Sequence, residues 1–200
     1  MPTLLYGVGD ITGIMRPTIE HKKAYKVWSH MLERCYSESC ILKHPTYIYC
    51  YVETSWLKFK NFLVWFNENY IKDYFLDKDL KKLGNKEYSE KYCSFVPRTL
   101  NNLLINSKNS RGKYPVGVTE DSKNIKGIKY TYYKARFSAN GQSNYLGLFS
   151  TIAEAQVAYN IAKSDHIITY SNKNNLPQEI KATLLQAANY IRRGKEKWVW

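Results

Sequence analysis

The sequence predicts an α+β fold: an N-terminal helical segment with a strand–strand–helix unit, then a three-stranded antiparallel sheet packed on one helix, and a C-terminal helix. Three observations predict it. Apolar residues recur at helical spacing near the N-terminus, strand-like segments separated by a tight turn follow the middle of the chain, and a helix-capping pattern comes directly after them. Aromatic residues make up 15% of the 200 residues, so enough apolar surface exists to offset chain entropy, and disorder is not expected.

The first predicted helix begins near Ala24. Its apolar positions have the spacing of a one-faced helix, and they are Ala24, Val27, Trp28, Met31, Leu32, Cys35 and Tyr36. Residues 37–52 break this period and predict a loop with a short extended piece at Tyr47–Val52. A second helix is predicted behind Thr54 or Ser55 as N-cap. Its apolar stripe is Trp56, Phe59, Leu63, Phe66 and Tyr70. We interpret both stripes as hydrophobic core.

The middle of the chain predicts a strand at Leu76–Asp79, a turn at Gly84–Lys86, a second strand at Tyr92–Val96 and a short helix. Pro97 suits the first turn of that helix, where its missing N–H needs no partner. The polar residues that follow have no apolar period and predict a linker. We therefore expect a domain at residues 1–106, a linker at 107–113 and a second domain at 114–200.

The second domain predicts three strands, at Val116–Thr119, Tyr130–Ala139 and Asn144–Phe149, with an Asn140-Gly141 hairpin turn before the last. The middle strand alternates, which predicts one basic, solvated face and one small, buried face. The residues of the first face are Tyr132, Lys134, Arg136 and Ser138, and those of the second are Tyr133, Ala135 and Phe137.

Two helices are predicted after the sheet. Thr151 and Glu154 form a capping box at the start of the first, which offers a flat stripe to the sheet at Ala155, Ala158, Tyr159 and Ala162. The final helix begins near Pro177. Its apolar positions are Ile180, Leu184, Ala187, Ala188 and Ile191.

Charge is concentrated in the second half of the chain. The 30 Lys and Arg against 17 Asp and Glu give a net charge of +13. Residues 1–105 hold 15 basic and 11 acidic side chains, net +4, and residues 106–200 hold 15 and 6, net +9. A basic excess of this size favours a polyanionic partner through counterion release. No apolar run approaches the roughly 18 residues of a membrane span, and no signal pattern opens the chain, so a cytoplasmic protein without a membrane partner is expected.

The C-terminal unit resembles the Apetala-type (ethylene-response-factor) DNA-binding domain. The resemblance covers about residues 113–168 and rests on Gly117-Val118, Lys134–Phe137, Tyr145–Phe149, Ala153–Ala155 and Ala158-Tyr159. In that family the three-stranded sheet lies in the major groove and the helix packs behind it.

The resemblance implies which side chains face the DNA: Thr119, Asp121, Arg136, Ser138 and Tyr145, with Lys134 on the same face. The plant domains carry Arg at several of these places and Trp where Tyr145 stands. The docking mode is therefore expected to carry over and the base preference is not, because bidentate guanine contacts need Arg or Lys.

The segment from Asp77 to Asn102 resembles the ββα metal finger of HNH nucleases, and the whole layout resembles that of phage-encoded HNH homing endonucleases. The resemblance implies Asp77 as the first ligand of Mg²⁺ or Mn²⁺ and Asn101 or Asn102 as the ligand on the helix. Lys78 stands where the family has the His that acts as general base.

Two departures make this finger degenerate. Lys78 carries an ammonium, whose ordinary pKa of about 10.4 keeps it protonated at neutral pH and unable to accept a proton from water. Cys93 or Ser94 occupies the position of the Asn that orients the His in the family. Catalytic roles for Asp77, Lys78 and Asn101 are thus expected to be weak or lost, and with them cleavage.

A zinc site made by Cys35, Cys50 and Cys93 with His44 is a further candidate. No C-x-x-C pair is present, and Cys35 lies on a core-facing stripe. Buried free thiols are the favoured interpretation, and zinc is not expected.

The leading hypothesis is a double-stranded DNA-binding protein with a sequence preference, derived from a phage HNH homing endonuclease, in an infected bacterial host. An active metal-dependent HNH nicking endonuclease stays open beside it. So does a protein-binding phage inhibitor of a host defence or nucleic-acid enzyme, which the C-terminal Trp198-Val199-Trp200 favours slightly because indoles are frequent in protein interfaces. The sequence leaves the oligomeric state open.

Overall fold

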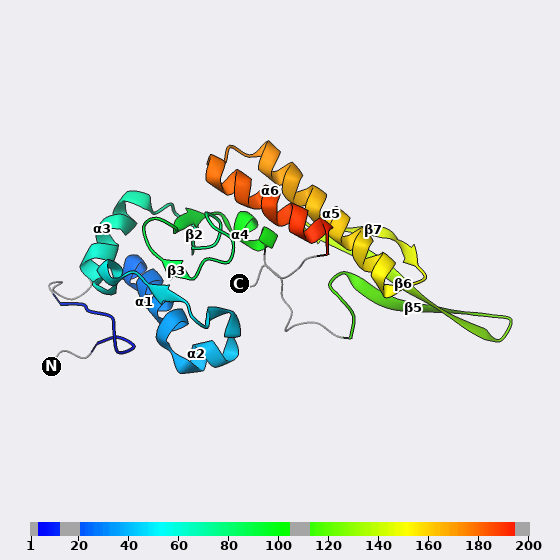
Figure 1. Cartoon of the computed structure of the whole chain (residues 1–200), viewed down its shortest axis with the longest axis horizontal. Helices are drawn as coiled ribbons and strands as arrows, with labels where there is room; N and C mark the ends of the chain where they lie inside the picture. Colours follow the sequence, from blue (N-terminus) through cyan, green and yellow to red (C-terminus); the bar gives the residue numbers. More distant parts are fainter. Residues whose placement is uncertain (1–3, 13–20, 105–112, 195–200) are drawn as a thin grey trace. The chain divides into compact units, whose positions relative to one another are not determined.

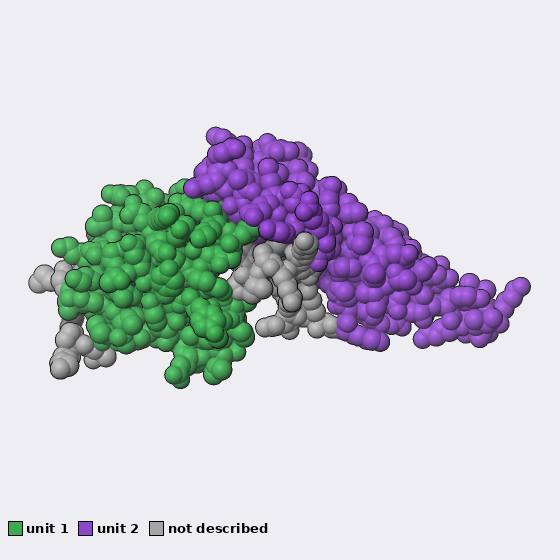
Figure 2. Space-filling model, viewed as in Figure 1, with its two compact units in different colours: residues 1–103, 199–200 green, residues 104–198 purple. Residues whose placement is uncertain are grey.

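The computed structural model describes residues 4–12, 21–104 and 113–194. The chain divides into two compact units, residues 1–103 with 199–200 and residues 104–198 (Figure 2). The predicted linker at 107–113 lies outside the described residues except for Lys113. Trp198-Val199-Trp200, considered above as a protein-binding feature, also lies outside them. No helix in the described part of the chain is long and apolar enough to cross a bilayer.

The first unit contains two aromatic helices, α1 (Lys22–Tyr36) and α3 (Phe59–Asn69), and the stripe predicted on the first is core. The stripe predicted on the second is only partly right, because the buried side chains of α3 are Phe59, Phe62, Trp65 and Phe66. Trp28 is fully buried and stacks at a tilt on Phe59, with 5.2 Å between ring centroids. Its indole Nε1 donates to the carbonyl of Trp56 at 2.7 Å. Tryptophan is thus buried here with its one polar atom satisfied, as a well-packed core requires.

The predicted start of the second helix, behind Thr54 or Ser55, is wrong. A 3-10 turn occupies Thr54–Leu57, and Lys58 is the N-cap of α3. The cause is a backbone pairing with a distant segment: Asp10 donates its N–H to Leu57 O at 2.8 Å, and the N–H of Phe59 donates to Asp10 O at 2.9 Å. These bonds satisfy backbone groups that a continuous helix would otherwise use.

Part of the predicted loop at residues 37–52 is helical. A short helix, α2 (Glu38–Lys43), begins at Ser37, whose side chain accepts from the N–H of Cys40. Ser37 is an ordinary N-cap residue, but six residues are too few for an apolar period to register in the sequence. A 3-10 turn at Pro45–Tyr47 and the strand β1 (Tyr51–Val52) follow, so only the end of the extended piece predicted at Tyr47–Val52 is a strand.

The strand–strand–helix unit has the predicted order. β2 (Phe75–Asp77) pairs antiparallel with β4 (Ser94–Val96), and α4 (Arg98–Leu104) follows. In the loop between β2 and β4, the strand β3 (Glu87–Tyr88) pairs in parallel with β1. This contact joins segments more than 30 residues apart, so local sequence does not encode it. This unit is called the finger below, residues 75–104.

The second unit confirms the predicted sheet. β5 (Val118–Ile125), β6 (Ile128–Ala139) and β7 (Gln142–Phe149) form an antiparallel sheet in the order β5-β6-β7. Helix α5 (Ile152–Lys173) packs across all three strands, and α6 (Gln178–Arg192) packs on α5 (Figure 1). The Thr151–Glu154 capping box and the Asn140-Gly141 turn, with φ of 53° and 76°, are both present.

Helix α5 covers one face of the sheet. Ala135 is fully buried beneath it, and Phe137 contacts the rings of Tyr159 and His166, with centroids 5.8 and 5.4 Å away. Gly117 makes this close approach possible: a Cβ there would lie 2.2 Å from the Tyr159 ring and 2.4 Å from the carbonyl oxygen of Arg136. Its φ of +73° is also one that other residues rarely adopt.

Replacing Gly117 with Ala should therefore destabilise the second unit by about 3 kcal/mol or more, from backbone strain and overpacking together. Gly127→Ala is a matched control because Gly127 has a similar φ of +82° and no atom within 4 Å of the added Cβ. We expect it to cost about 1 kcal/mol. Urea unfolding followed by circular dichroism measures both, and equal losses would contradict the packing role of Gly117.

Candidate nucleic-acid interface

The face of the β5-β6-β7 sheet opposite α5 is the candidate interface, and it is called the outer face below. Directly paired residues of an antiparallel sheet point to the same side. The alternation along β6 sends Ala135 and Phe137 to α5, so their neighbours along the strand point outward. The outer face therefore carries Thr119, Asp121, Tyr132, Lys134, Arg136, Ser138 and Tyr145.

All six residues that the resemblance places toward DNA, Asp121 and Lys134 included, lie on this face. Thr119 pairs with Lys134, and Arg136 pairs with Tyr145. Thr119, Arg136, Ser138 and Tyr145 are exposed, Tyr145 at 58% of its surface, and Lys134 is partly exposed. The described residues thus leave this set open to solvent rather than sealed beneath another element.

A bulge in β7 puts Tyr145 beside Arg136. The register steps from Ala135 opposite Gly147 to Arg136 opposite Tyr145, so Leu146 is the extra residue. If the register continued without the bulge, Arg136 would pair with Leu146, and Tyr145 would point toward α5. Gly147 adopts a φ of +141° at this point. A glycine inside a strand often marks a bulge, but it does not fix which residues are paired across it.

The two basic residues of the outer face differ in their surroundings. The ammonium of Lys134 lies 2.8 Å from Oδ2 of Asp121, and this hydrogen bond lowers the pKa of the Asp121 carboxyl below its usual value. Both side chains are about one-third exposed, so the pair contributes little to stability. Arg136 has no carboxylate partner among the described residues. Its guanidinium is therefore the stronger candidate for an anionic ligand.

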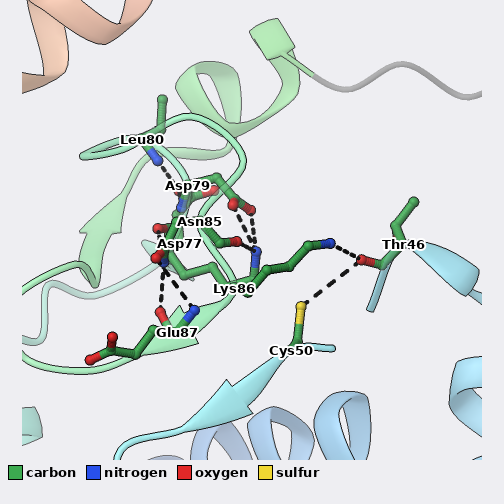
Figure 3. A network of polar contacts seen from close by, with 9 residues as sticks. Thr46, Cys50, Asp77, Asp79, Leu80, Asn85, Lys86 and Glu87 are labelled. Carbon is green, nitrogen blue, oxygen red and sulfur yellow. Dashed lines mark hydrogen bonds and ion pairs between the residues drawn. The ribbon is translucent and has the colours of Figure 1, made fainter. Parts of the chain in front are cut away.

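Lys78 lies in the interior of the finger and acts as a structural cross-link. Its partners Asp79 and Asn85 are labelled in Figure 3. Only 3% of Lys78 is exposed. Its ammonium donates to both carboxylate oxygens of Asp79, at 2.7 and 2.8 Å, and to the carbonyl of Asn85 at 2.7 Å. An ammonium has three donors and no lone pair, and all three donors have a partner here. Lys78 is thus not arranged to accept a proton from water.

Asn85 completes this network and was not singled out from the sequence. It is buried, and its Nδ2 donates to the carbonyls of Lys78 and Glu87 at 2.9 and 2.6 Å. The residue therefore closes the long loop between β2 and β4. Its place in a Gly-Asn-Lys turn indicated only a bend, because burial depends on contacts that the turn itself does not contain.

Asp77 has a local role as well. Its Oδ1 accepts from the N–H groups of Asp79 and Leu80, both at 2.8 Å, which shapes the turn after β2. Burial raises the pKa of the Asp77 carboxyl, against these hydrogen bonds. Burial likewise raises the pKa of Asp79 to about 6. The carboxyl groups of Asp77 and Asp79 are therefore both bound to other groups of the protein.

The two asparagines proposed as helix ligands lie on α4. Asn101 is partly buried and donates its backbone N–H to Pro97 at 3.1 Å, and Asn102 is exposed. Among the described residues, no group of three or more His, Cys, Asp or Glu side chains has the arrangement of a metal site. The finger has the strand–strand–helix order of the metal fingers that it resembles. Asp77, Asn101 and Asn102 stay the candidate ligands of Mg²⁺ or Mn²⁺.

The cysteines are free thiols. Cys35, Cys50 and Cys93 are buried in the hydrophobic core of the first unit, and Cys40 is partly exposed. Burial raises the pKa of the Cys35 thiol to about 12 and raises those of Cys50 and Cys93 as well. Thiols with raised pKa values are weak nucleophiles, so the three side chains serve as small apolar core residues.

The Lys78 cross-link generates a stability prediction. Lys78→Met should destabilise the first unit by about 3 to 5 kcal/mol, because it leaves the Asp79 carboxylate buried without its partner. The matched control is Lys60→Met on the exposed side of α3, which should change the free energy of unfolding by less than about 0.5 kcal/mol. Equal midpoints of urea unfolding for the two variants would refute the structural role.

Comparison of the chain with protein-family models, with curated protein sequences and with solved structures found no match. Among the described residues, polar and charged side chains gather at the exposed outer face of the second unit and in the buried network of the finger.

Proposed function

We propose that this protein binds double-stranded DNA, with the duplex against the outer face of the β5-β6-β7 sheet. The observation that supports the proposal most is the gathering of Thr119, Lys134, Arg136, Ser138 and Tyr145 on one solvent-exposed face, with α5 on the opposite face. Such a face offers hydrogen-bond donors and positive charge on a rigid support, which is what a nucleic-acid surface requires.

The dimensions of the sheet favour a duplex. Three strands about 4.8 Å apart present a surface about 10 Å across, close to the major-groove width of about 12 Å. The excess of positive charge in the second half of the chain, net +9, would lower the free energy of any approach to phosphate groups.

The side chains suggest a limited reading of bases. Arg136 can donate two hydrogen bonds to guanine, the commonest specific contact to DNA. Tyr145, directly opposite, adds a hydroxyl and an aromatic ring beside it. Lys134 must give up part of its contact with Asp121 before it binds a phosphate. We therefore propose a modest sequence preference that depends chiefly on Arg136.

Cleavage is not part of the proposal. General-base catalysis requires a group with a free lone pair near the attacking water. The ammonium of Lys78 instead donates to Asp79 and to the carbonyl of Asn85 in the interior of the finger. We propose that the finger is a structural remnant of a nuclease-like unit with weak or no activity.

The binding proposal is tested by an electrophoretic shift assay on duplex DNA at low salt. Arg136→Ala should weaken binding by about 10-fold or more, corresponding to about 1 to 3 kcal/mol, because a bidentate contact is lost. Lys173→Ala, which removes the same charge from an exposed site at the end of α5, should change affinity by less than about 3-fold. No measurable duplex binding by the unaltered protein would overturn the proposal.

A plasmid assay separates binding from nicking. Supercoiled plasmid incubated with the protein and Mg²⁺ or Mn²⁺ should stay supercoiled, because the general base is missing. If nicking occurs and Asn101→Ala abolishes it while duplex binding persists, the protein is an active nuclease and the finger is its site. Asn101 suits this test better than Asp77, whose carboxylate shapes the turn after β2.

A further inference from the structure

The sheet continues past the part that α5 covers. β7 pairs with β6 only from Tyr133 to Ala139, whereas β5 and β6 remain paired out to Ile125 opposite Ile128. Residues 122–131 therefore form a two-stranded ribbon, called the hairpin arm below, which extends beyond the rest of the sheet (Figure 1). Every residue of the arm is exposed.

The arm was not predicted as a strand pair, because its first strand was expected to end at Thr119. The turn that closes it is Lys126-Gly127, with φ of 51° and 82°. Positive φ at both central residues is the geometry that matches the twist of a hairpin. Ile125 and Ile128 flank the turn and pair across it.

The arm carries positive charge and no acidic residue. Lys123, Lys126 and Lys129 give residues 122–131 a net charge of +3. Its tip is also apolar: Ile125 and Ile128 are 49% and 58% exposed. An isolated two-stranded ribbon is at best marginally stable in water, and an anionic partner would complement the charge of this arm.

The register places part of the arm on the same side as the outer face. Lys123 pairs with Tyr130, and Ile125 with Ile128, in phase with the Thr119–Lys134 pair. Six residues separate Lys134 from Ile128, a length of about 20 Å at 3.3 Å per residue. The outer face and the arm thus form one continuous surface, which twists along its length as strands do.

We propose that the hairpin arm is a second DNA contact, which follows the groove beyond the sheet and binds duplex DNA. Lys123 and Lys126 bind phosphate groups, and the Ile125–Ile128 pair contacts the base edges in the groove. Lys129 pairs with Asn124 and points to the opposite side of the ribbon, so it is not assigned a phosphate contact. Lysines without an acidic neighbour on the arm complement the charge of phosphates, and a two-stranded ribbon fits the major groove. This inference rests on the proposed function, since it extends the same DNA-binding surface.

The test uses the full chain with Lys123→Gln and Lys126→Gln combined. Each phosphate contact contributes about 0.9 to the slope of log K against log salt concentration, so the slope should fall by about 2 in magnitude. The matched control is the combination of Lys60→Gln and Lys173→Gln, two exposed positions outside the arm. It removes the same charge and should leave the slope within about 1 of the unaltered value.

A footprint and an apolar variant give independent measurements. The lysine variant should lose protection over about 4 base pairs at one edge of a hydroxyl-radical footprint, since the four residues in each strand of the arm span about 13 Å at 3.3 Å per residue and a base pair rises about 3.4 Å. Replacing Ile125 and Ile128 with Ser should weaken binding about 10-fold with the salt slope unchanged. Circular dichroism should match that of the unaltered protein, because the arm is exposed on both faces.

The outcomes separate the two proposals. If Arg136→Ala weakens binding and the arm variants change neither slope nor footprint, the arm proposal is wrong and the outer-face proposal stands. An unchanged slope with new self-association would mean that the lysines only protect an exposed strand pair from aggregation. The arm proposal would also be overturned if the arm variants weakened binding to single-stranded DNA and left binding to duplex DNA unchanged. No duplex binding by the unaltered protein would overturn both.

Discussion

The close contact between the β5-β6-β7 sheet and helix α5 determines what the second unit can present to solvent. Gly117 lets the sheet approach Tyr159, and Ala135 and Phe137 fill the space beneath the helix. Because strand side chains alternate, burying this set forces the intervening residues outward. Arg136 and its neighbours are exposed for that reason, and no separate interaction has to hold them there.

Lys78 stands at the position of the general base in the nuclease fingers that this unit resembles, but its contacts give it a structural role. A basic residue follows β2 at the place where a catalytic base was sought, yet Lys78 is buried and bound to Asp79 and to the carbonyl of Asn85. A buried ion pair is costly to break, so it keeps the long loop between β2 and β4 in one conformation. The same contacts occupy the donors of the ammonium, which makes a structural role and a catalytic role mutually exclusive at this residue.

The outer face and the hairpin arm both present lysine or arginine side chains to solvent, but their supports and their acidic neighbours differ. Positive charge lies on a support that is rigid where α5 covers it and open on both faces where it does not. Along the outer face, Asp121 offsets the charge of Lys134, whereas the arm carries no acidic residue. In the proposed binding mode, phosphate contacts are therefore made mainly by the arm, and base recognition mainly by Arg136.

Periodicity alone determined the aromatic helices, the capping box before α5 and the alternation that put Arg136 and Phe137 on opposite faces, because each depends on residues close together in the chain. Only tertiary structure decided the start of α3, the burial of Lys78 and the phase shift at Leu146. The first depends on Asp10, the second on a loop closed by Asn85, and the third on the register of two strands. Contacts between distant residues leave no period in the sequence, so the chain encodes them only through the packing of the whole unit.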